Sequence, residues 1–241
     1  MFSFFATPVD DGYGGFTYHP TMLSYTILVL LMLILLLAAS AFHAKISGEN
    51  VSDESKSRRV NLRQLAFSSM AIALSIVGSM IRLFSLPMGG EVTLCSMLFV
   101  TLIGSWFGLN AGLSCGIALG LLRLIIDPYI ISIPQLLCDY VLAFGALGLS
   151  GLFYRKHQTA IPAIITGYLT GIFGRFVFSV LSGVIFFASY APAEGPFHNP
   201  LLYSAAYNGS YIAAEGALTI VILLLPPVRK AVENISRIAN G

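Results

Sequence analysis

The stretch Gln135-Leu136-Leu137-Cys138-Asp139-Tyr140-Val141-Leu142-Ala143-Phe144-Gly145 places one carboxylate inside an apolar segment. The whole chain is similarly apolar, because 56% of its 241 residues are hydrophobic and only 10% are charged. A soluble domain averages about 25% charged residues. The chain is therefore expected to lie in a bilayer, where a charge at a helix centre costs about 2.5–3.5 kcal/mol on insertion scales and usually marks a site.

Apolar stretches long enough for spanning helices, at about 20 residues each, recur along the chain. A first stretch near residues 22–43 is followed by six more, near 64–84, 92–108, 110–126, 134–153, 160–189 and 206–228. We predict an all-α integral membrane protein with a six-helix core and one additional N-terminal transmembrane helix. The predicted parts are 1–45 (helix with a short outside tail), 46–62 (polar cytoplasmic linker), 63–232 (six-helix membrane domain) and 233–241 (cytoplasmic tail).

Basic residues orient these helices, since Lys and Arg collect on the cytoplasmic side. Placing the linker inside puts ten of the thirteen Lys and Arg there, namely Lys45, Lys56, Arg58, Arg59, Arg63, Arg155, Lys156, Arg229, Lys230 and Arg237. The N-terminus is then outside and the C-terminus cytoplasmic. This topology brings Asp139, Tyr203 and Asn208 towards the outer face.

The N-terminal apolar stretch has a second interpretation, a cleaved signal peptide, because Ala39-Ser40-Ala41 is typical of a cleavage site. Residues 1–20, however, carry Asp10 and Asp11 and no Lys or Arg. The apolar run also exceeds the roughly 7–15 residues of a signal h-region. A retained helix is favoured.

Two acidic residues inside the apolar segments have alternative roles. Asp139 is a candidate cation partner or hydrogen-bond acceptor for a ligand, or else an ion-pair partner of Arg82, Arg123 or Arg175. Glu215 is a candidate partner of an arginine such as Arg175, or a ligand contact. In either role an uncompensated carboxylate is not expected in the membrane.

A second polar and aromatic cluster, Tyr203-Ser204-Ala205-Ala206-Tyr207-Asn208, begins another helix. Aromatic residues near the outer face are typical of an interfacial belt, but aromatic faces also bind flat rings and cations. Their company with Asp139 favours a pocket for a small, flat, cationic molecule. Pro87-Met88-Gly89-Gly90 predicts a tight turn, either a lid over that pocket or a plain loop.

Several classes of function are poorly supported. The chain has no GxxxxGK[ST] loop for ATP and no HExxH zinc motif. No basic and aromatic surface for nucleic acid is visible, and no cofactor is expected. A small integral-membrane enzyme that uses Asp139 as an acid-base group is the alternative from another class.

Between Asn61 and Arg229 the chain resembles a known family, the substrate-binding (S) components of energy-coupling factor (ECF) vitamin transporters, and among them the thiamine-binding branch. Each matching piece is weak alone, but their order and spacing are specific. In chain order they are Pro87-Met88-Gly89-Gly90 with Glu91 and Thr93, the Gly-rich run 104–120, Gln135–Phe144, Arg175, Ser182–Phe187, Tyr190-Ala191-Pro192 and Tyr203–Gly209.

The resemblance implies a six-helix protein of the bacterial cell membrane that captures thiamine from outside and is not an enzyme. Its implied partners are a transmembrane coupling subunit and two cytoplasmic ATPase subunits. In that family the ligand site includes a carboxylate followed by Tyr, and a Tyr and an Asn five residues apart. The expected substrate-binding residues are Asp139, Tyr140, Tyr203, Asn208, Phe187 as the stacking ring with Phe186 second, Ser179 and Tyr207.

This chain departs from the family pattern at two positions. Ser179 stands where the family often has His, four residues after the arginine. The stacking position commonly holds a tryptophan, whereas the only tryptophan here, Trp106, is predicted near the inner face. These departures leave open an S component for a thiamine precursor or another vitamin.

Overall fold

The structure is a computed structural model that describes residues 6–10, 16–23, 26, 54–154, 159–192 and 194–240. The N-terminal transmembrane helix predicted near 22–43 lies almost wholly outside the described residues. A short antiparallel hairpin, β1 (Ala6–Asp10) and β2 (Phe16–Pro20), precedes it.

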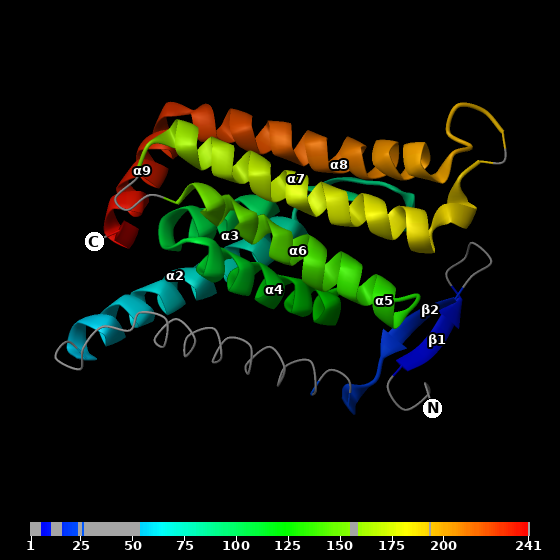
Figure 1. Cartoon of the computed structure of the whole chain (residues 1–241), viewed down its shortest axis with the longest axis horizontal. Coiled ribbons are helices and arrows are strands. Elements are labelled where there is room, and N and C mark those ends of the chain that lie inside the picture. The colour runs from blue at the N-terminus through cyan, green and yellow to red at the C-terminus, as the bar shows by residue number, and fades with distance from the viewer. Residues whose placement is uncertain are drawn as a thin grey trace.

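The core is a bundle of apolar helices that lie side by side (Figure 1). They are α2 (Glu54–Met80), α3 (Ser96–Phe107), α4 (Leu109–Ile126), an irregular segment at 133–153, α7 (Ile161–Phe186) and α8 (Pro200–Leu224). Within the described residues, five helices are long and apolar enough to cross a membrane, and α3 is shorter. Apolar side chains such as Met70, Phe173, Ile185 and Val221 are at least 60% exposed on them, as expected of lipid-facing surfaces.

The 133–153 segment changes helix type along its length. It begins as α5 (Ile133–Leu136), widens into the π-helix η3 (Leu137–Leu142), and continues through α6 (Ala143–Gly145) into the 3₁₀-helix η4 (Ala146–Phe153). A π-turn inside a helix is uncommon and is frequently found at functional sites. Asp139 and Tyr140 lie in this π-turn.

Glycines of α4 allow that segment to approach closely. A Cβ placed on Gly116 would overlap the carbonyl oxygen of Phe144, and one on Gly120 would overlap the carbonyl oxygen of Tyr140. Only residues without a side chain permit such close backbone packing between membrane helices. The Gly-rich run therefore determines where Asp139 and Tyr140 lie.

The prediction of a purely α-helical fold was wrong between the first two core helices. Strands β3 (Arg82–Ser85) and β4 (Glu91–Thr93) pair antiparallel around the 3₁₀-turn η2 (Pro87–Gly89). Met88 (φ 63°) and Gly89 (φ 87°) adopt left-handed backbone conformations in this turn, and the reversal lets the two short flanks pair. The helix predicted from 92 consequently begins at Ser96.

Helix boundaries also differ from the prediction at both ends of the domain. Helix α2 begins at Glu54, inside the predicted linker, where Glu, Lys and Arg are good helix formers. Helix α8 begins at Pro200 rather than at 206, because Asn199 caps it by accepting a hydrogen bond from Leu201 N at 2.9 Å. The predicted tail is largely helical: α9 (Pro226–Asn240) turns across the end of the bundle (Figure 1).

Candidate functional site

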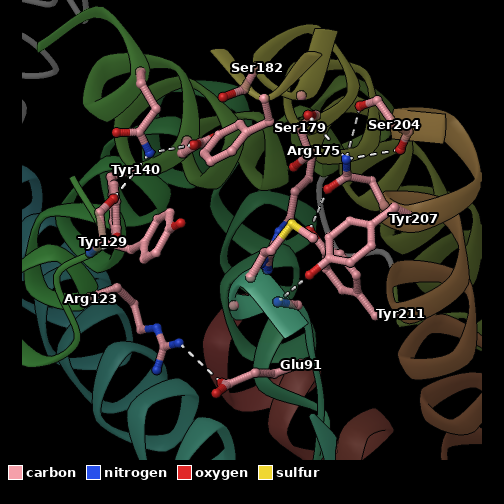
Figure 2. Close-up of a pocket in the computed structure, with 18 of the residues that line it drawn as sticks. Glu91, Arg123, Tyr129, Tyr140, Arg175, Ser179, Ser182, Ser204, Tyr207 and Tyr211 are labelled. Atoms are coloured by element: carbon pink, nitrogen blue, oxygen red, sulfur yellow. Dashed lines mark hydrogen bonds and ion pairs between the residues drawn. The ribbon is translucent and has the colours of Figure 1, made fainter. Parts of the chain in front are cut away.

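A cavity of about 360 Å³ lies between the hairpin β3–β4, the end of α4, the π-turn, α7 and α8. In Figure 2, Tyr129 and Tyr140 stand on one side of it and Tyr207 and Tyr211 on the other. Seven of the eight predicted site residues line it: Asp139, Tyr140, Ser179, Phe187, Tyr203, Tyr207 and Asn208. Phe186, the second candidate for the stacking ring, is not among the lining residues.

The Asp139 carboxylate is partly buried and has few protein partners. Its Oδ2 accepts a hydrogen bond from Gln135 Nε2 at 2.7 Å, and Ser182 and Arg175 also interact with it. The expected alternative, an ion pair with Arg82, Arg123 or Arg175, is not what the structure shows: within the described residues no basic group lies within 4.0 Å of Asp139. The carboxylate therefore keeps acceptor capacity towards the cavity.

Gln135 holds that carboxylate in place. Its side chain is 1% exposed. Its Oε1 accepts from Ile131 N at 3.0 Å, and its Nε2 donates to the Tyr129 carbonyl at 3.1 Å as well as to Asp139. Because both ends of the amide are bonded, Gln135 orients Asp139 and is not free to rotate.

Two of the arginines form a charged cluster at the mouth of the cavity. Arg82 contacts Glu91 and Asp127, both at 2.9 Å. Arg123 lies 3.6 Å from the other oxygen of Glu91 and donates to Ser79 at 3.0 Å. The cluster ties the hairpin to the C-terminal end of α4, with Glu91 paired to both guanidinium groups; Figure 2 shows its contact with Arg123.

Arg175 is placed differently. Its guanidinium carbon lies 4.4 Å from the centroid of the Phe144 ring, which is a cation–π contact. The described residues provide no hydrogen-bond partner for its buried Nε. Arg175 lines the cavity, so it contributes positive potential near Asp139 without neutralising it through direct contact.

Backbone and hydroxyl donors hold the Glu215 carboxylate, in place of the arginine that was expected as its partner. It is 3% exposed. Its Oε2 accepts from Thr93 N at 3.0 Å and from Thr93 Oγ1 at 2.7 Å. Its Oε1 accepts from Ser96 Oγ at 2.9 Å and from Met97 N at 3.2 Å. Glu215 thus caps the N-terminus of α3 from α8, where a negative charge is favoured.

Tyr140 and Asn208 use their polar atoms largely within the protein. The Tyr140 hydroxyl accepts from Tyr129 N at 2.8 Å and donates to the Asp127 carbonyl at 3.1 Å. Asn208 Nδ2 donates to the Ser204 carbonyl at 3.0 Å, and its Oδ1 accepts from Tyr211 at 2.8 Å. Both residues therefore shape the wall of the cavity and orient their neighbours.

Aromatic rings form two walls. Phe187 stacks on Tyr129, with centroids 6.1 Å apart and an interplanar angle of 22°. Tyr203 stacks on Tyr207 across 6.2 Å at 27°. The Phe187–Tyr129 pair lies just after α7 and α4, whereas the Tyr203–Tyr207 pair lies on α8. The cavity therefore presents ring faces from two directions, which suits a flat molecule.

The turn Pro87–Gly89 reaches the cavity through Tyr207. Gly90 N donates to the Tyr207 hydroxyl at 2.9 Å, and that hydroxyl donates to the Pro87 carbonyl. Gly90 itself sits so close to Tyr207 and Tyr211 that a side chain there would collide with them. The turn predicted from Pro87-Met88-Gly89-Gly90 is therefore hydrogen-bonded to α8 beside the cavity.

Some lining residues are not singled out by the sequence pattern. Glu91, Tyr129, Gln135 and Tyr211 all face the cavity. Two signals were available: Glu91 and Gln135 fall in stretches that resemble the family, and Gln135 lies four residues before Asp139, which places the two on one helix face. Trp106 is not among the lining residues, and it donates a hydrogen bond to Ser236 on α9 at 2.8 Å.

Comparison with known proteins agrees with this architecture. A family model described as "Thiamine transporter protein (Thia_YuaJ)" matches residues 65–234. Thiamine transporter ThiT of Bacillus subtilis (strain 168) is 32% identical over 177 residues, which cover 69% of this chain and 89% of that protein. Thiamine transporter ThiT of Lacticaseibacillus paracasei is 30% identical over 122 residues, covering 47% of this chain and 59% of that protein.

A solved structure shares the fold. The structure of ThiT from Listeria monocytogenes superposes with a TM-score of 0.53 at 23% identity, covering 71% of this chain and 97% of that one. The family match extends from α2 into α9 and includes every lining residue of the cavity. The chain belongs to the thiamine transporter protein family, the thiamine-specific S components of ECF transporters.

Proposed function

We propose that this multi-pass membrane protein captures thiamine in the cavity beside Asp139, as the substrate-binding subunit of an ECF transporter. Family membership supports the ligand class, and one observation carries the site: a carboxylate in an apolar helix, oriented by Gln135 and open to an aromatic cavity. The volume of about 360 Å³ falls in the range of about 300–1,000 Å³ that is typical of small-molecule pockets.

The ligand's chemistry suits these groups. Thiamine carries a permanently cationic thiazolium ring and an aminopyrimidine that donates and accepts hydrogen bonds. Asp139 complements the cation or the amine, and a hydrogen bond to an ionised group is stronger than a neutral one. Phe187 and the Tyr203–Tyr207 pair supply ring faces, where a desolvated cation gains about 2 kcal/mol or more.

In this proposal the six helices of the S-component core are α2, α3, α4, the 133–153 segment, α7 and α8. Residues 22–43 add one N-terminal transmembrane helix outside the core. Phe187, Ser179, Tyr140, Tyr203, Tyr207 and Asn208 form the binding wall with Asp139, and Phe186 remains the second candidate for stacking. A transmembrane coupling subunit and two ATPase subunits supply the energy, since the sequence contains no nucleotide-binding loop of its own.

A thiamine precursor is the second candidate ligand. The observation that favours it is the composition of the wall: Ser179 and Phe187 line the cavity at positions where the resemblance leads us to expect His and Trp. A smaller ring at 187 and the lack of an imidazole at 179 weaken contacts to the full two-ring vitamin more than to a single pyrimidine ring.

Calorimetric titration of the purified full chain in detergent tests both candidates. Thiamine, the hydroxymethyl-pyrimidine precursor and riboflavin are titrated separately. We expect stoichiometric binding of thiamine, at least 100-fold tighter than either control. Tighter binding of the precursor would reassign the ligand, and no binding of any of the three by a folded sample would overturn the proposed function.

A further inference from the structure

We infer that α9 is an interfacial helix that places an apolar edge among lipid acyl chains and a basic face against anionic phospholipid headgroups on the cytoplasmic side. It follows α8 directly, after Leu225, and begins with Pro226-Pro227, which cannot continue the preceding backbone hydrogen bonds. The chain turns here, and α9 crosses the end of the bundle opposite α5 (Figure 1).

One strip of α9 is packed against the bundle and fixes how the helix is rotated. Val232, Ser236 and Ala239 are at most 8% exposed and recur with helical spacing. Ser236 Oγ accepts a hydrogen bond from Trp106 Nε1 at 2.8 Å, and Trp106 is itself 5% exposed. This buried bond pins α9 to α3, so its remaining faces have defined directions.

The edge beside that strip is apolar and uncovered. Ile235 is 41% exposed and Ile238 is 65% exposed. They are three residues apart and so are neighbours on the helix surface. Leu224 and Leu225, at the end of α8, are also about half exposed. The lipid-facing apolar surface of α8 therefore continues onto this edge of α9.

The face directed away from the bundle is basic. Lys230 and Arg237 are exposed and lie seven residues apart, which places them on one side of the helix. Arg229 is paired with Glu233 at 2.9 Å, whereas no ion pair of Lys230 or Arg237 is found in the described part of the chain. Arg63, in the N-terminal half of α2, is exposed as well.

These two surfaces identify the partner by chemistry. An amphipathic helix with a basic polar face lies in the membrane interface, and anionic lipids increase its binding. Basic residues next to a cytoplasmic helix end are attracted to the negative surface of that leaflet. A neutral apolar partner would leave Lys230 and Arg237 uncompensated, so an anionic lipid surface fits both features.

Spin labelling of the full chain tests the apolar edge. Ile235→Cys carries the probe, and Asn234→Cys is the matched control, because consecutive residues point about 100° apart on a helix. The unmutated protein measures the background from Cys95, Cys115 and Cys138. In vesicles of phosphatidylcholine and phosphatidylglycerol, we expect the label at 235 to contact oxygen in the acyl region and the label at 234 to contact a water-soluble nickel reagent. Equal access of both labels to nickel, or shielding of 235 from both reagents, would overturn the inference.

Native mass spectrometry of lipids retained by the protein tests the basic face. We expect phosphatidylglycerol to be retained over phosphatidylcholine, and Lys230→Gln/Arg237→Gln to lower that enrichment at least threefold. Lys230→Arg/Arg237→Lys keeps the charge and should keep the enrichment. Trp106 fluorescence verifies that α9 remains docked in each variant. Unchanged enrichment in the neutral double variant would show that headgroup charge is not recognised.

Discussion

Asp139 and Glu215 are both carboxylates inside apolar helices, yet the structure treats them in opposite ways. Glu215 receives four hydrogen bonds from Thr93, Ser96 and Met97 and is 3% exposed. Asp139 is oriented chiefly by one amide, that of Gln135, and it lines the cavity. The hydrogen-bond acceptor sites of Glu215 are filled within the fold, whereas Asp139 can still accept hydrogen bonds from a ligand.

The difference shows how a buried charge reveals its role. A charge whose acceptor sites are filled by backbone and hydroxyl donors stabilises the fold, here by joining α8 to the start of α3. A charge left open to an aromatic cavity is suited to a ligand, because a cation there replaces lost hydration. Sequence position alone does not separate the two, since each carboxylate lies within an apolar segment.

The largest expected effect comes from Asp139→Asn. This change removes the charge but keeps the shape, so thiamine affinity should fall by about 100-fold or more, equivalent to about 2.7 kcal/mol. The thermal midpoint of the free protein should change little. Calorimetric titration and thermal unfolding in detergent measure the two quantities.

Asp127→Asn is the control for Asp139→Asn, because Asp127 also lines the cavity but is already paired with Arg82 at 2.9 Å. We expect its effect on affinity to stay below about fivefold, in keeping with an exposed ion pair of about 0–1 kcal/mol. Equal losses in the two variants would make Asp139 a general contributor to negative potential.

Glu215→Gln should have the opposite effect to Asp139→Asn: it should lower stability and leave thiamine affinity nearly unchanged. The introduced amide group faces donors, so at least one buried donor loses its acceptor, at a cost of about 1–3 kcal/mol. We expect a lower thermal midpoint, with thiamine affinity of the folded fraction changed less than about threefold, or about 0.7 kcal/mol. A large loss of affinity with unchanged stability would move Glu215 into the binding site.

Gly120→Ala tests whether the close packing of α4 positions Asp139. The new Cβ would overlap the Tyr140 carbonyl oxygen, and overpacking of this kind typically costs about 1–3 kcal/mol. Because Asp139 precedes Tyr140 in the π-turn, we expect both thiamine affinity and stability to fall. Titration and thermal unfolding check this.

The matched control for Gly120→Ala is Gly209→Ala on α8. There the nearest atom to a new Cβ is Phe176 Cε2, at an ordinary 3.5 Å. We expect this variant to bind as the parent does. If Gly120→Ala also bound normally, the π-turn would be able to shift without moving the carboxylate.

The smallest effect is expected from Tyr207→Phe. The hydroxyl bridges the Pro87 carbonyl and Gly90 N, so its removal breaks the hydrogen bonds between the turn and α8. A hydrogen bond contributes about 0.5–1.5 kcal/mol net, and we therefore expect a few-fold faster thiamine release. Stopped-flow dissociation measures the rate. An unchanged rate would show that the hairpin does not retain the ligand.

Much of the site was predictable from the sequence, because the relevant side chains fall near one face by topology. Asp139 in 134–153 and Asn208 in the last span are each near the outer end once the basic residues are placed inside. The structure places both residues in one cavity, and the outward orientation stays a prediction. The contacts of Arg82 with Asp127 and of Glu215 with Thr93 and Ser96 were not predictable, since they join residues at least 45 positions apart that only packing brings together.

Local conformation was harder to predict than span placement. Hydropathy identifies a run such as 133–153 but does not distinguish an α-turn from the π-turn that holds Asp139, because all helix types satisfy backbone groups in lipid. Similarly, the amphipathic α9 was expected as part of a tail, since its charged residues lower the average hydropathy.

By itself, the sequence determined that this chain lies in a membrane, and it predicted which end of each span faces outward and that Asp139 has a role in binding. Membrane insertion follows from transfer free energies, which depend on composition over about 20 residues, whereas orientation is predicted from the placement of Lys and Arg. Only the tertiary structure decided that Glu215 is satisfied internally while Asp139 is not, because hydrogen-bond saturation depends on which distant backbone and hydroxyl donors packing brings within about 3 Å.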